Sequence, residues 1–251
     1  MTVWKKYAVL MQECPPVLFA TVSGAHLYGF ESPDSDVDLR GVFVRSAEEV
    51  LGLFPPEETI SVSEMREDLE LDFVAHDLLK FARLMTKNNG YVLEQLFSPL
   101  VVVGGERHAE LKEIAKGLIT RHQYHHYRGF SSKKIKEALG ADGTVKSMLY
   151  AFRTLLTGLY LLRTGTVEAN LVRLSDEYSM PELLELVEKK RSDREKDALP
   201  TEEAERWRPL LEKLAGRLDE AFETSNLPEE ASTTRELSEF VTRVRLEGMH
   251  E

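Results

Sequence analysis

The sequence changes its periodicity near residue 105, and this change constrains the fold more than any other feature. Before it, short apolar or alternating stretches are typical of β-strands, and after it apolar residues recur at helical spacing. The strands we expect are Val17–Val22, Val37–Val44, Leu69–Val74 and Leu100–Val103. Shorter helices are expected over 25–29, 77–86 and 91–97, and residues 51–63 resemble a loop. The longer helices we expect are 107–119, 122–139, 144–164, 181–196, 201–223 and 232–247. The chain is therefore expected to form a mixed domain over 1–105 and an all-helical domain over 106–251.

Composition narrows the class of protein. The chain has 251 residues, is 42% apolar, and carries 32 Lys and Arg against 43 Asp and Glu, a net charge of −11. It contains no uninterrupted apolar stretch typical of a signal peptide or membrane span, and a single cysteine, Cys14, permits no internal disulfide. We expect a cytoplasmic protein that does not act on a membrane. The negative charge argues against non-specific coating of nucleic acid, because the average field repels phosphate.

Two aspartates at the start of the second expected strand point to a metal site. Asp36 and Asp38 are two residues apart, so on a strand their carboxylates share one face, roughly 7 Å apart. Carboxylates in this arrangement hold Mg²⁺, which also takes substrate phosphates as ligands. A third acid, Asp72 or Glu70, lies on another expected strand. Three acids around two metal ions suit phosphoryl or nucleotidyl transfer.

A small-residue turn precedes these acids. Ser23, Gly24 and Ala25 follow the first expected strand and open a short helix. Backbone N–H groups exposed in such a turn can hold a triphosphate.

These motifs carry a family resemblance. Gly24-Ala25-His26-Leu27-Tyr28-Gly29, followed by Asp34-Ser35-Asp36-Val37-Asp38-Leu39-Arg40-Gly41-Val42, resembles the DNA polymerase β-like nucleotidyltransferases. It is most similar to the RNA-ligase-associated group of that superfamily, which is linked to RNA repair, and the resemblance spans roughly residues 17–165. It implies an α+β fold: an N-terminal nucleotidyltransferase domain with a mixed sheet and flanking helices, followed by an all-helical domain.

The resemblance also implies roles for single residues. It makes Asp36, Asp38 and Asp72 the ligands of two Mg²⁺, with Mn²⁺ as an alternative, and gives Asp72 a part in deprotonating the acceptor. Gly24 would let the backbone approach the phosphates, and His26 would lie beside the nucleotide. The superfamily usually has Gly-Ser in this turn, whereas here Ala25 follows the glycine and Ser23 precedes it. Arg40 shares the face of the acids, where it either offsets their repulsion or contacts a phosphate.

The middle of the chain is locally basic. Between Arg121 and Arg163 eight Lys and Arg are opposed by two acids. Lys146, Tyr150 and Arg153 share one helix face and are expected to bind the nucleotide. In the segment 121–128 histidines alternate with aromatic and basic residues, a pattern that fits nucleotide or RNA contact better than zinc, because no cysteine or His-Glu-x-x-His pattern accompanies it.

The leading hypothesis is an enzyme that moves a nucleoside monophosphate from an NTP to a hydroxyl and releases pyrophosphate. The resemblance implies an RNA 3′ end as acceptor and a functional association with an RNA ligase. A second hypothesis keeps the chemistry but places the nucleotide on a protein or a small molecule. A third is a catalytically decayed protein that binds nucleotide and regulates a partner, which the retained acids oppose.

Overall fold

The computed structural model describes residues 4–11, 14–33, 35–66, 69–192 and 198–248. The chain forms two compact units, and it crosses between them four times. Unit 1 comprises residues 1–24, 36–118 and 230–251, and unit 2 comprises 25–35 and 119–229. Each unit is described separately below.

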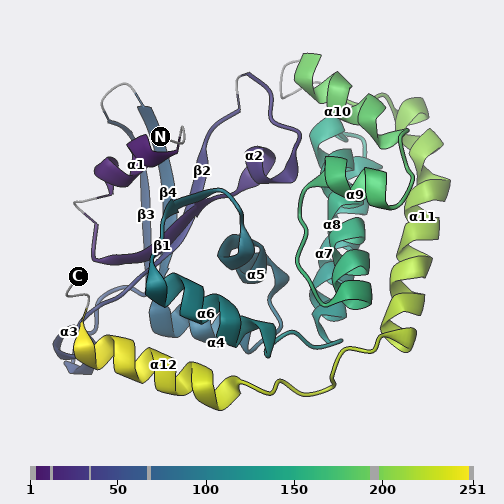
Figure 1. Cartoon of the computed structure of the whole chain (residues 1–251). Helices are drawn as coiled ribbons and strands as arrows, with labels where there is room; N and C mark the ends of the chain where they lie inside the picture. The colour runs from purple at the N-terminus through teal and green to yellow at the C-terminus, as the bar shows by residue number, and fades with distance from the viewer. Residues whose placement is uncertain (1–3, 12–13, 34, 67–68, 193–197, 249–251) are drawn as a thin grey trace. The chain divides into compact units, whose positions relative to one another are not determined.

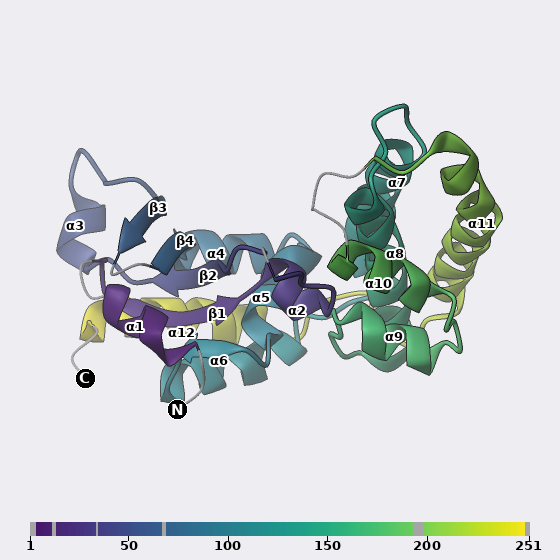
Figure 2. The ribbon, with the colours of Figure 1, turned by 90° about the horizontal axis from the view of Figure 1, so that it is seen from above.

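Unit 1 is built on a five-stranded mixed sheet with the order β3-β4-β2-β1-β5, of which Figure 2 labels the first four strands. The strands are β1 (Val17–Val22), β2 (Asp38–Phe43), β3 (Thr59–Arg66), β4 (Leu69–Asp77) and β5 (Val101–Val103). The β2–β4 pair is parallel and the other pairs are antiparallel. The chain thus contains a mixed sheet with flanking helices, followed by a helical region. This arrangement confirms the expected α+β fold.

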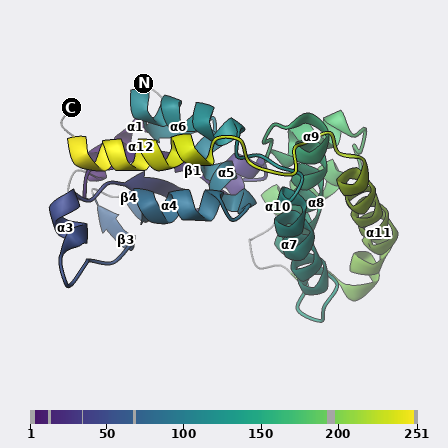
Figure 3. The ribbon, with the colours of Figure 1, turned by 90° about the horizontal axis from the view of Figure 1, so that it is seen from below.

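Helices of unit 1 cover both faces of this sheet. On one face lies α1 (Lys5–Leu10). Its residue Tyr7, and Met11 directly after it, pack in the apolar cluster of the central strands. On the other, α4 (Leu78–Met85), α5 (Gly90–Phe97) and α6 (Glu106–Lys116) contact the strands. The last helix, α12 (Thr234–Glu247), lies across α4 and α6 (Figure 3). The short helix α3 (Ala47–Leu51) begins at Ser46, whose side chain forms a capping box with Glu49.

The expected loop over 51–63 is partly wrong. Residues 59–63 form the first half of β3, which pairs along its length with β4. Ile60 and Val62 alternate with polar residues as in a half-buried strand, but this stretch is short and follows the loop-like Pro55-Pro56, and only its pairing with β4 shows that it is a strand.

Unit 2 is a group of helices around α8 (Val145–Thr164), most of whose residues are buried. The others are α7 (Gln123–Ala138), α9 (Leu171–Glu177), α10 (Leu183–Ser192) and α11 (Thr201–Thr224) (Figure 1). The helix α2 (Gly24–Tyr28) starts at the last residue of the first segment of unit 1 and continues into unit 2. No helix among the described residues combines the length and apolar character needed to cross a bilayer.

Candidate active site

The register of the parallel strands brings two of the expected acids together. Asp38, the first residue of β2, pairs directly with Asp72 on β4. Their side chains are 31% and 34% exposed, so both carboxylates are reachable from solvent without being fully solvated. This pair is the centre of the candidate site in unit 1.

Arg40 is the counter-charge of this pair. Its Nη2 lies 2.8 Å from Asp38 Oδ1 and 3.6 Å from Asp72 Oδ2. Its Nη1 donates to the carbonyl of Leu39 at 2.7 Å, and the side chain is only 16% exposed. Burial alone lowers the pKa of Arg40, but Tyr91, Asp38 and Asp72 together raise it above its ordinary value, so the guanidinium stays charged.

The turn after β1 packs directly against Asp38. The amide of Ser23 donates to the carbonyl of Asp38 at 2.8 Å. Gly24 has a φ of +61°, and a Cβ added there would lie 1.9 Å from Asp38 Oδ2. Only glycine therefore leaves room for this carboxylate at the start of α2. Ser23 is 1% exposed, and its hydroxyl has no hydrogen-bond partner within the described residues.

The other expected acids are placed differently. Asp36 is exposed and lies two residues before β2, not on the strand. Glu70 lies in β4 opposite Met65, and its side chain falls outside the described part of the structure. Among the described residues, no group of three or more His, Cys, Asp or Glu side chains is arranged to hold a metal ion. The three-acid site therefore remains a prediction, and the structure supplies the pair Asp38 and Asp72.

A divalent cation fits the chemistry of this pair. Mg²⁺ takes hard oxygen ligands, and often only one or two of them are protein carboxylates, because substrate phosphates complete the shell. Asp38 and Asp72 provide such oxygens, and Gly24 keeps the space beside Asp38 free of a side chain.

Sequence reasoning missed Tyr91, the second residue of α5. Its hydroxyl accepts a hydrogen bond from Arg40 Nε at 3.4 Å, and the residue is 37% exposed. Asn89-Gly90 marks the start of this helix, and the side chain of Asn89 caps it by accepting from the Tyr91 amide. The local signal shows where the helix starts but not that its first turn lies beside the acids.

The remaining expected nucleotide-binding residues belong to unit 2. Ala25 and His26 follow Gly24 in α2, and Ala25 is buried. Lys146 and Tyr150 are half-buried on α8, whereas Arg153 is only 3% exposed. The Arg153 guanidinium stacks on the ring of Tyr28, 4.0 Å from its centroid. Arg153 is thus inside the unit and is not part of an open basic face.

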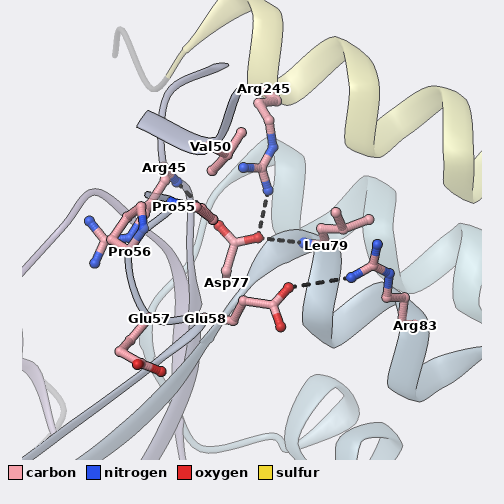
Figure 4. A pocket seen from close by; sticks show the side chains of 10 residues that line it. All are labelled: Arg45, Val50, Pro55, Pro56, Glu57, Glu58, Asp77, Leu79, Arg83 and Arg245. Atoms are coloured by element: carbon pink, nitrogen blue, oxygen red, sulfur yellow. Dashed lines mark hydrogen bonds and ion pairs between the residues drawn. The ribbon is translucent and has the colours of Figure 1, made fainter. Parts of the chain in front are cut away.

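A cavity of about 290 Å³ lies in unit 1 at the far end of β4 (Figure 4). Its polar centre is Asp77, which accepts hydrogen bonds from Arg245 and from the amide of Leu79. None of the residues that line it belongs to the carboxylate pair. The cavity is therefore separate from the candidate site.

Comparison with known proteins identifies the family of the chain. The family model of the RNA repair pathway DNA polymerase beta family matches residues 4–243, nearly the whole chain. The chain belongs to this family. The family consists of polymerase β-like nucleotidyltransferases in RNA repair, and the resemblance noted from the motifs of residues 24–29 and 34–42 is confirmed.

Two curated relatives are similar over much of the chain. An uncharacterized protein of Methanocaldococcus jannaschii is 29% identical over 228 residues, which are 88% of this chain and 90% of the relative. The uncharacterized protein YcgL of Bacillus subtilis is 29% identical over 154 residues, which are 60% of this chain and 58% of the relative. Neither name assigns a substrate.

Proposed function

We propose that this chain is a metal-dependent nucleotidyltransferase that moves an NMP from an NTP to the 3′ hydroxyl of RNA. The observation that carries the proposal is the direct pairing of Asp38 with Asp72 beside Gly24. Two carboxylates on adjoining strands, next to a turn with room only for glycine, suit a cation and a phosphate chain at one place. The family, linked to RNA repair, supports RNA as the acceptor.

The proposed reaction balances as a single displacement. The acceptor oxygen forms a bond to the α-phosphorus, the bond from that phosphorus to the pyrophosphate oxygen breaks, and pyrophosphate leaves. Asp72 accepts the proton of the attacking hydroxyl, as the family resemblance implies. Asp38 and Asp72, with Asp36 as the third predicted ligand, would hold divalent cations, which would stabilise the negative charge of the phosphates. The amide of Ser23 is already used by the carbonyl of Asp38, so in this proposal it is Gly24 that lets the phosphate chain approach the backbone of the turn.

Arg40 changes its partner in this proposal. Arg40 is now the counter-charge of Asp38 and Asp72, and a cation held by these two acids would supply that positive charge in its place. The guanidinium is then available to a phosphate oxygen, for which its paired N–H groups are well suited. Under this proposal Arg40 would offset the repulsion of the acids before substrate binds and contact a phosphate afterwards.

Labelled nucleotide transfer tests the proposal. Each α-labelled NTP is incubated with the purified chain, Mg²⁺ or Mn²⁺, and RNA that has either a free or a blocked 3′ end. We expect label on RNA with a free 3′ hydroxyl only. Label on a protein or a small hydroxyl compound instead would contradict RNA as the acceptor, and no transfer to any acceptor would contradict the activity.

Amide variants of the two acids test the site itself. Asp38→Asn and Asp72→Asn each remove a ligand charge without changing side-chain size. We expect transfer to fall by more than the roughly 10–100-fold that loss of an outer-shell partner costs a metal site. Glu64→Gln, at an exposed position on β3 of the same unit, is the matched control and should keep full activity. Equal rates in Asp38→Asn and Glu64→Gln would contradict the assignment.

A further inference from the structure

Helix α7 uses one of its faces to bind α11. The hydroxyl of Tyr124 donates to Asp219 Oδ1 at 2.8 Å, and Arg128 Nε donates to the same oxygen at 2.7 Å. The ring of Tyr124 stacks on Phe222 with centroids 4.5 Å apart. These aromatic and basic residues of the segment 121–128 therefore hold unit 2 together.

A different face of α7 carries three residues that this packing does not use. His126, Phe130 and Lys134 are spaced four residues apart and so follow one side of the helix. The rings of His126 and Phe130 are parallel within 4°, with centroids 6.1 Å apart. Lys134 Nζ lies 5.7 Å from the Phe130 ring and 5.5 Å from the ring of Tyr150 on α8. We call these four residues the α7 platform.

The platform combines an exposed flat ring with a rigid support. Phe130 is 38% exposed, and among the described residues of α7 and α8 it is the only exposed large hydrophobic side chain. Tyr150, the other ring near Lys134, contacts Tyr28 and Phe30 edge to face, with centroids 5.5 and 5.6 Å apart. Because an aromatic side chain has few rotatable bonds, the exposed Phe130 ring can stack on a ligand at little cost in conformational entropy.

The segment of the chain that carries most of the platform is locally basic, although the whole chain is acidic. Between residues 123 and 150 five Lys and Arg are opposed by two acids, whereas the chain carries a net charge of −11. Lys134 pairs with Glu137 at 2.7 Å, a partly exposed pair that contributes little and yields readily to a phosphate. Burial and the charge of Arg153 lower the pKa of His126 to about 4, so its ring is neutral near pH 7.

We propose that the α7 platform binds unpaired nucleotides of RNA, with a base stacked on Phe130 and a phosphate held by Lys134. The inference rests on the proposed function, for which it identifies a surface that holds the acceptor strand. One exposed aromatic ring among lysines fits a base and a phosphate better than it fits a protein, which would require a broader apolar patch. Duplex RNA hides the faces of its bases, so the platform favours single strands.

Equilibrium binding tests the platform separately from catalysis. A short fluorescent single-stranded RNA is titrated with the full chain in EDTA, and fluorescence anisotropy reports the dissociation constant. Phe130→Ala should weaken binding by about 5- to 150-fold, the loss expected for one stacked base. Phe130→Tyr keeps a ring and should bind like the wild type. The same strand annealed to its complement should bind more weakly.

Matched controls come from unit 1. Phe54→Ala removes an even more exposed phenylalanine, and Lys116→Ala removes a lysine that pairs with Glu113 as Lys134 pairs with Glu137. Both should bind RNA like the wild type, whereas Lys134→Ala should not. Circular dichroism confirms that each variant is folded.

The outcomes separate the two proposals. Wild-type affinity in Phe130→Ala, equal losses in Phe130→Ala and Phe54→Ala, or equal binding of duplex and single strand would each overturn the platform. Binding that depends on Phe130 without any nucleotide transfer would overturn the proposed activity alone. Transfer to RNA together with binding that is insensitive to Phe130 would overturn the platform alone.

Discussion

Gly24 is the residue on which the geometry of the acids depends most directly. Its φ of +61° is unfavourable for any residue with a Cβ, and that Cβ would lie 1.9 Å from Asp38 Oδ2. Gly24→Ala should therefore lower the free energy of unfolding by about 1–3 kcal/mol and displace the Asp38 carboxylate. Urea unfolding and the transfer assay measure the two effects.

Gly52 provides the control for this substitution. Its φ is −70°, and a Cβ added there would meet no atom within 4 Å. Gly52→Ala should leave transfer unchanged and leave stability unchanged or slightly increased. If Gly24→Ala is as stable and active as Gly52→Ala, the close approach of the turn to Asp38 has no functional role.

His108 makes the stability of unit 1 depend on pH. The residue is 4% exposed, its ring stacks on Phe19 with centroids 4.5 Å apart, and its Nε2 donates to the carbonyl of Leu96. Burial, aided by Lys112, lowers the pKa of His108 to about 4, whereas the unfolded chain has the ordinary value near 6.5. The neutral His108 ring therefore makes its full contribution to the free energy of unfolding above pH 6.5, and this contribution is lost as the pH falls toward 4.

The size of this effect follows from linkage. A shift of this extent corresponds to at most about 3 kcal/mol, which the wild type loses between pH 6.5 and 4. His108→Gln is less stable at neutral pH because it lacks the stacked ring, but it has no group that titrates there. Urea unfolding across this pH range should show the difference between the two proteins narrowing as the pH falls. Parallel profiles would contradict the role of His108.

The residues of the candidate site differ in how far the sequence predicts them. Asp38, Asp72 and Gly24 follow from strand, turn and motif, because each lies where a local pattern places it. Asp36 was expected on a strand, but β2 begins only at Asp38. The nearness of Tyr91 to Arg40 and the burial of Arg153 depend on packing between distant segments, about which local spacing says nothing.

At the scale of elements, a buried ion pair links the last helix, α12, to the start of α4 within unit 1. Arg245 of α12 lies 2.5 Å from Asp77, the N-cap residue of α4, and their side chains are 10% and 5% exposed (Figure 4). Arg245→Ala would leave a buried carboxylate without its cation, which typically costs about 3–5 kcal/mol. Urea unfolding measures this loss.

Arg235 of the same helix is the matched control. Its side chain is 89% exposed and pairs with Glu239 one turn later. Arg235→Ala should change the free energy of unfolding by less than about 0.5 kcal/mol, as is usual for exposed pairs. Similar losses in both variants would show that the Asp77 pair does not hold α12 in place.

At the scale of the whole molecule, apolar periodicity locates the helices in the sequence but does not say to which unit each belongs. The helix expected over 232–247 was correctly located, but its apolar face packs on α4 and α6 of the sheet unit. Apolar spacing identifies a buried face without identifying what buries it. The residues 25–35 likewise interrupt unit 1 although they lie between two of its strands. The expected domains 1–105 and 106–251 therefore remain a prediction.

The distribution of charge over the whole molecule makes a prediction about salt. An acidic chain repels RNA on average, so binding must depend on a few local contacts such as Lys133, Lys134 and Lys136 of α7. Each phosphate contact to a single strand releases counterions. With about three such contacts, a plot of log affinity against log salt concentration should have a slope near −2. Raising KCl from about 50 to 200 mM should then weaken RNA binding by roughly 20-fold. Lys134→Ala should reduce the slope by about 0.7, and Lys116→Ala should leave it unchanged. A slope near zero, or one that Lys134→Ala does not alter, would show that RNA is held elsewhere on the molecule.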